Sequence, residues 1–152
     1  MKKQSPNWYI AATHYLTAGF VPPLLLGFLA SFIASISPLF IAGISKVLFG
    51  FIFLVLAIWL GTMYSAKYLK KTYVITSESK QRIVNLATFY FIVLRLIFYI
   101  YGFLLIMTKI RISGGTIADF LLNIFIFIAV GGVLFYYLSR KYITEDSAIT
   151  NQ

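Results

Sequence analysis

Apolar residues in this chain fall into four long runs, separated by short polar or basic stretches. The runs cover approximately residues 8–36, 39–68, 83–107 and 116–137. Each has roughly the 20 residues that an α-helix needs, at about 1.5 Å per residue, to cross about 30 Å of hydrocarbon. The pattern therefore predicts an all-α membrane protein with four transmembrane helices, forming a single transmembrane domain over residues 1–152.

Prolines set the local expectations for the first half of the chain. Proline lacks an N–H group and suits the first turn of a helix, so Ser37 and Pro38 can end the first helix and begin the second. The alternative places this turn at residues 43–46. We favour the first placement, which leaves Lys46 inside the second helix. Within the first run, Pro22 and Pro23 are expected to kink the helix or divide it in two.

Composition supports membrane integration and excludes several classes of chemistry. The chain is 61% hydrophobic and only 11% charged, whereas soluble domains carry about 25% charged residues. It contains no cysteine, which excludes disulfides, thiolate metal sites, iron–sulfur clusters and thiol redox catalysis. The net charge of +9 does not indicate nucleic-acid binding, because the basic residues gather at the ends of the apolar runs, where they mark topology.

The basic residues predict the orientation of the helices. Four spans place both termini on one side, and the loop at residues 67–82 lies on that side too. Nine of the 13 lysines and arginines lie there: Lys2, Lys3, Lys67, Lys70, Lys71, Lys80, Arg82, Arg140 and Lys141. The other side holds Lys46, Lys109 and Arg111. The positive-inside rule therefore predicts both termini and a basic loop in the cytoplasm. The basic loops, with no targeting peptide in the sequence, favour the plasma (bacterial inner) membrane, and a eukaryotic membrane is the alternative.

The two halves of the sequence echo one another. The motif at residues 12–15 (ATHY) returns 75 residues later as ATFY, and residues 27–29 (GFL) return at the same offset. Residues 65–69 (SAKYL) match residues 139–143 (SRKYI) at an offset of 74. This regularity favours two parallel helical-hairpin repeats. The alternative is coincidence in a chain with few residue types.

A small set of polar residues lies inside the predicted spans. Arg95 is at the midpoint of the third span and shares a helix face with Tyr99, four residues later. In the fourth span Asp119 and Asn123 also lie four residues apart, at a depth similar to that of Lys46. A charge at mid-membrane costs at least about 2.5–3.5 kcal/mol. We therefore predict that Asp119 pairs with Lys46 or with Arg95.

Two interpretations of this cluster remain open. It can be a buried ion pair that fixes the register of the helices, or it can be a binding site on a pathway through the membrane. Ionisable residues inside a membrane raise a functional hypothesis by default. If Arg95 is unpaired, its positive charge in a low-dielectric setting favours an anion and repels cations.

Signatures of catalysis and of metal binding are missing. The sequence has no HExxH, no G-x-S-x-G and no pair of carboxylates in a span. His14 is the single histidine, and a metal site would lack ligands around it, so we expect it to be packed or interfacial. We expect no enzyme activity, no catalytic residue, no metal and no cofactor.

These observations support two functional hypotheses. The first is a non-enzymatic subunit, or an assembly or scaffold component, that packs through its helices against a second copy or a larger membrane-protein partner within the lipid bilayer. The second is a small oligomeric transporter or channel for an anionic solute, with Arg95 on the pathway. Arg95 discriminates between them: the first predicts a paired, dry arginine, and the second an arginine that faces a cavity.

Overall fold

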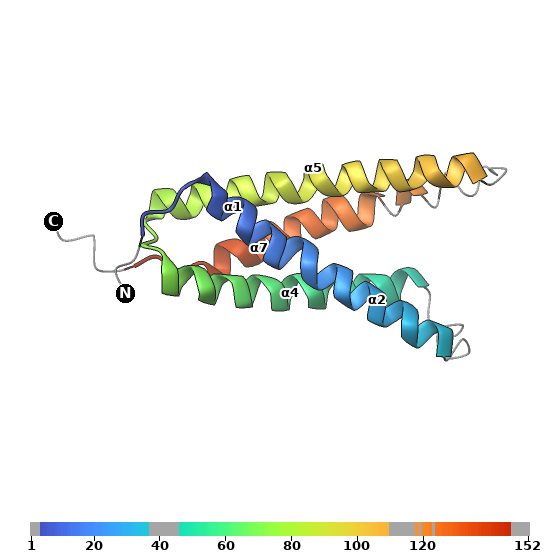
Figure 1. Cartoon of the computed structure of the whole chain (residues 1–152), viewed down its shortest axis with the longest axis horizontal. Helices are drawn as coiled ribbons and strands as arrows, with labels where there is room; N and C mark the ends of the chain where they lie inside the picture. The colour runs from blue at the N-terminus through green and yellow to red at the C-terminus, as the bar shows by residue number, and fades with distance from the viewer. Residues whose placement is uncertain (1–3, 37–45, 110–117, 119, 123, 147–152) are drawn as a thin grey trace.

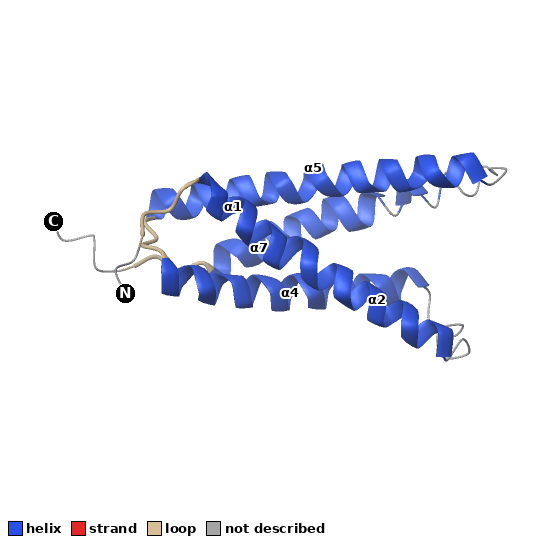
Figure 2. Ribbon diagram, viewed as in Figure 1, coloured by secondary structure: helices blue, strands red, loops and turns tan. Residues whose placement is uncertain are grey.

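A computed structural model describes residues 4–36, 46–109, 118, 120–122 and 124–146. The described chain is helical almost throughout (Figure 1, Figure 2). In chain order the elements are α1 (Trp8–Tyr15), the π-helical turn η1 (Leu16–Phe20), α2 (Val21–Ile36), α4 (Lys46–Thr72), α5 (Ser77–Lys109), the π-helical turn η2 (Phe125–Val130) and α7 (Gly131–Tyr142).

Four helical stretches are long and apolar enough to cross a membrane. They are Trp8–Ala30, Leu48–Thr72, Ser77–Leu105 and Phe120–Tyr142. The prediction of an all-α protein with four helices able to span a membrane is confirmed for the described residues. The first helix is described as far as Ile36, and the predicted turn after it lies outside the described residues.

Helices extend well into the stretch that we expected to be a basic loop. Helix α4 continues to Thr72 and α5 begins at Ser77, so residues 73–76 alone connect them. The start of α5 has a local cause. The Thr76 hydroxyl accepts from the Ser79 backbone N–H at 3.2 Å, and the Ser79 hydroxyl accepts from the Thr76 N–H at 2.8 Å. This reciprocal cap satisfies two backbone donors and fixes the first turn.

The two ends of the described chain meet at the α4–α5 connection. The Gln4 N–H donates to the Thr72 carbonyl at 3.2 Å, and the Val74 N–H donates to the Gln4 carbonyl at 3.0 Å. On the other flank, the Asp146 N–H donates to the Ile75 carbonyl at 2.9 Å. Both ends therefore lie at one end of the bundle (Figure 1), as an even number of membrane spans requires.

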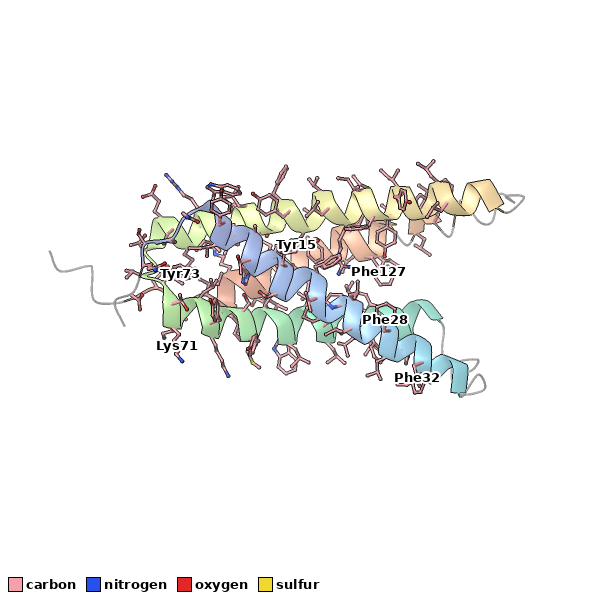
Figure 3. All side chains as sticks on the ribbon, viewed as in Figure 1. Tyr15, Phe28, Phe32, Lys71, Tyr73 and Phe127 are labelled. Carbon is pink, nitrogen blue, oxygen red and sulfur yellow. The ribbon has the colours of Figure 1, made fainter. Side chains whose placement is uncertain are left out.

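The core is divided between two apolar clusters, and the outer faces of the helices are apolar too. The larger cluster includes Tyr15, Ile58, Phe91 and Phe135, where α1, α4, α5 and α7 pack together. The second cluster lies near the terminal end. Away from the core, Phe28 on α2 projects outward (Figure 3) and is 69% exposed. Exposed apolar side chains of this kind suit contact with lipid tails.

The first helix passes through its two prolines without being divided. Helix α1 runs through η1 into α2, and at η1 the Val21 N–H donates to the Leu16 carbonyl, five residues back. Of the two expected outcomes, the division of the helix is not seen, and the local change is this wider turn. Proline has no N–H, so Pro22 and Pro23 cannot give the usual bonds to carbonyls one turn earlier. Those carbonyls therefore need hydrogen-bond donors from elsewhere in the bundle.

Candidate functional site

Arg95 supplies a donor that the first helix lacks. Its Nη2 atom donates to the Gly19 carbonyl at 2.9 Å. In an α-helix that carbonyl would accept from the N–H of residue 23, which is a proline in this chain. Pi-helical turns and prolines in membrane helices commonly have their freed backbone groups satisfied by a neighbouring helix. Arg95 therefore joins α5 to the turn of the first helix in which prolines interrupt the backbone hydrogen bonds.

An aromatic ring covers one side of the same guanidinium. The Arg95 Cζ atom lies 4.7 Å from the centroid of the Phe91 ring, one helical turn earlier. Phe91 in turn stacks on Phe135 of α7, with 5.0 Å between ring centroids, and meets the Tyr15 ring edge-on. A cation over an aromatic face is stabilised by about 2 kcal/mol when desolvated. The guanidinium is thus held by η1 and α5, and the ring beneath it is packed by α1 and α7.

Among the described residues, Arg95 uses only a small part of its hydrogen-bonding capacity. A guanidinium has five N–H donors, and among the described residues its one hydrogen-bond acceptor is the Gly19 carbonyl. The ion pairs in the described part of the chain are Lys80 with Glu145 and Arg82 with Glu78, both near the terminal end. No described carboxylate neutralises Arg95. Within the described part of the chain, N–H groups of Arg95 are thus left for a further acceptor.

Two pockets share Arg95 on their walls. One, of about 340 Å³, lies between α2 and α5 and is lined by Phe20, Pro23, Leu24, Arg95, Phe98 and Tyr99. The other, of about 240 Å³, reaches between α2, α4, α5 and η2 and includes Pro23, Gly50, Arg95, Tyr99 and Phe127 in its lining. Phe127 lies inside the bundle (Figure 3). Pro23, Arg95 and Tyr99 belong to both pockets, so the guanidinium borders the bundle interior and the α2–α5 face.

The predicted polar cluster is seen only in part. Arg95 and Tyr99 lie together, one turn apart on α5, and line the same two pockets. Lys46 is the first described residue of α4. Asp119 and Asn123 lie outside the described residues, and the pairing of Asp119 with Lys46 or Arg95 stays a prediction.

Sequence reasoning missed the part of the site that comes from the first helix. Gly19, Pro23 and Phe91 were not among the expected site residues. A signal for Gly19 was present, because two adjacent prolines inside a membrane helix leave carbonyls that require donors. An arginine in another span is one of few side chains able to reach such a carbonyl.

A second polar cluster surrounds His14 and joins α1, α4 and α7. The His14 Nδ1 atom lies 2.7 Å from the Ser65 Oγ atom, and Nε2 lies 2.9 Å from the Ser139 Oγ atom. The Thr17 hydroxyl lies 3.0 Å from that of Ser65. His14 is 0% exposed, so it is packed, as we expected. A neutral imidazole offers one donor and one acceptor, which matches two hydroxyl partners on α4 and α7.

The His14 cluster lies apart from the two pockets that Arg95 lines. Ser65 and Ser139 are buried as well, and neither of the two pockets at Arg95 reaches them. Within the described ranges no group of three His, Asp or Glu side chains could hold a metal ion. The cluster thus links three helices, and the candidate binding site is the one at Arg95.

Comparison with protein families, with curated proteins and with solved structures gives no match for this chain. A functional conclusion must therefore rest on the geometry of the site.

Proposed function

We propose that this protein is a small membrane transporter for an anionic solute, in which Arg95 is the anion-binding group. One observation carries the proposal: the Arg95 guanidinium borders two pockets, with a single described hydrogen-bond acceptor and no described carboxylate beside it. A fixed positive charge in a low-dielectric site attracts anions and repels cations. Tyr99, on the same pocket walls, offers a hydroxyl as a further donor.

The transporter proposal predicts charge-selective access to position 99. The chain has no cysteine, so Tyr99→Cys introduces a single thiol on the pocket wall and leaves Arg95 in place. In proteoliposomes, a negatively charged, membrane-impermeant thiol reagent should label it at least about tenfold faster than a positively charged reagent of similar size. Adding Arg95→Gln should abolish that preference. Labelling rates are measured from each side of the membrane.

A matched control separates access through a pocket from access through lipid. Val133 on α7 is 71% exposed on the outside of the bundle, so Val133→Cys should face lipid tails and resist both reagents. If the thiol at position 99 is as unreactive as the one at position 133 in a folded protein, the transporter proposal is wrong.

The hypothesis of a non-enzymatic subunit or scaffold component, which came first from the sequence alone, becomes the second proposal. Gly102 on α5 supports it, because a Cβ atom built there meets nothing within 4 Å. Glycines in membrane helices commonly allow another helix to approach closely. Disulfide formation between Gly102→Cys chains in native membranes would favour a homo-oligomer, and it is compatible with an oligomeric transporter as well.

We also propose which end of the bundle faces the cytoplasm, and that the bundle is built from two hairpin repeats. The terminal end carries the exposed Lys67, Lys70, Lys71, Arg140 and Lys141, so both termini are proposed to lie in the cytoplasm of a bacterial-type inner membrane. The two parallel hairpin repeats are supported by Ser65 and Ser139. These serines occupy matching positions at the offset of 74 and contact the two nitrogens of one histidine.

A further inference from the structure

We infer that the anion bound at Arg95 is amphiphilic: an oxyanion head group, carboxylate or phosphate, on a long alkyl chain. This inference rests on the proposed function and specifies its substrate class. The first reason is the lining of the pockets. Arg95 and Tyr99 are the polar side chains among the described lining residues of both pockets, and the others are apolar or glycine. A small hydrated anion would lose its water shell there and regain few hydrogen bonds.

The larger pocket opens toward the lipid. Leu24 on α2 is 45% exposed and Phe98 on α5 is 56% exposed, and both line this pocket. The Phe20 ring, which also lines this pocket, lies 5.6 Å from the Phe98 ring, centroid to centroid. Exposed apolar side chains on spanning helices face hydrocarbon. An alkyl chain can therefore lie between α2 and α5 and extend into the bilayer, without leaving an apolar environment.

The position of Arg95 fits the head group of such a molecule. The guanidinium stands where the two pockets meet, held by the Gly19 carbonyl and the Phe91 ring. Its planar N–H groups can bind a carboxylate or a phosphate through two parallel hydrogen bonds. The volume of about 340 Å³ lies in the range of small-molecule sites. An amphiphile would thus place its charge at Arg95 and its chain between Leu24 and Phe98.

Direct binding to the purified full-length protein in neutral detergent tests this inference. The probes are radiolabelled hexadecanoate and hexadecyl phosphate, with acetate, inorganic phosphate and hexadecyltrimethylammonium as competitors. We expect both long-chain anions to bind at least about tenfold more weakly to Arg95→Gln, the loss of one charge-assisted pair. Arg82→Gln is the matched control, because Arg82 is exposed on the same helix and paired with Glu78. It should bind like the original chain.

A second variant keeps the test informative if Arg95→Gln does not fold. Leu24→Trp fills the larger pocket from its exposed side and leaves Arg95 untouched. It should weaken hexadecanoate binding by a similar factor, because the alkyl chain then loses its place between Leu24 and Phe98. The tighter binder of the two long-chain anions identifies the source, a fatty acid or a lipid phosphate.

Three outcomes would overturn the inference. If acetate or inorganic phosphate competes as well as hexadecanoate does, the site takes small anions, and the proposed transport function stands. If hexadecyltrimethylammonium competes equally well, the site recognises the alkyl chain alone and does not select an anion. Unchanged binding in both Arg95→Gln and Leu24→Trp would place the amphiphile elsewhere. The labelling of position 99 shows independently whether the proposed transport of anions is wrong as well.

Discussion

Replacing Gly61 with alanine is expected to destabilise the bundle by about 3 kcal/mol. A Cβ atom at position 61 would lie 2.7 Å from the Ala18 carbonyl oxygen, 2.9 Å from the Ala18 Cα atom and 2.9 Å from the Pro22 Cγ atom. Two of these atoms belong to the backbone and the third to a rigid ring, so α4 would have to move away from η1. Overpacking of this kind costs about 1–3 kcal/mol. The measurement is the free energy of unfolding in mixed detergent micelles.

Gly102→Ala is the matched control for this substitution. Nothing lies within 4 Å of a Cβ atom at position 102, so the added methyl group meets no steric cost in the single chain. Alanine also favours a helix over glycine by up to about 1 kcal/mol. We expect unchanged or slightly higher stability. Equal stability of Gly61→Ala and Gly102→Ala would contradict the close contact between α4 and η1.

The fold could be predicted from the sequence because membrane helices are recognisable by length and hydropathy alone. Four apolar runs of sufficient length gave four candidate spans. The boundaries near residues 67–82 were less predictable, since basic residues end an apolar run without ending a helix. Here the helix start at Ser77 is set by the hydrogen bonds between Thr76 and Ser79. A Thr-x-x-Ser spacing is a weak signal beside a long hydrophobic run.

Only the part of the candidate site that lies on α5 was predicted from the sequence. Arg95 and Tyr99 could be identified because polar groups inside a span are rare and share a helix face. Their partner on the first helix is a backbone carbonyl, at Gly19, and we had looked for carboxylates. Backbone acceptors leave no residue type to recognise in the sequence. Only the adjacent prolines Pro22 and Pro23 point to an unsatisfied carbonyl nearby.

The partners of His14 were hidden for a different reason. Ser65 and Ser139 lie 51 and 125 residues away in the chain, and serine is too common to stand out. The internal echo had already matched these two serines to each other. It could not show that both face the same histidine, because that depends on how the two hairpins pack.

Replacing His14 with alanine is expected to lower the free energy of unfolding by about 3 kcal/mol. The substitution removes two buried hydrogen bonds, each contributing about 0.6–1.7 kcal/mol between membrane helices. It also leaves a cavity beside the Phe135 ring, which now lies 5.6 Å from the imidazole, centroid to centroid. Thr13→Ala is the matched control, because Thr13 is exposed and bonds locally to the Tyr9 carbonyl. It should change stability by less than about 0.5 kcal/mol.

Double-mutant cycles then test whether the three side chains act together. Ser65→Ala and Ser139→Ala should each destabilise the original chain by about 1 kcal/mol, and by much less once His14 is alanine, because their partner is then gone. If each serine substitution costs as much with alanine at position 14 as with histidine, the cluster does not couple the helices. Similar coupling energies for the two serines would support the proposed hairpin repeats, since matching positions would then make matching contributions around one histidine.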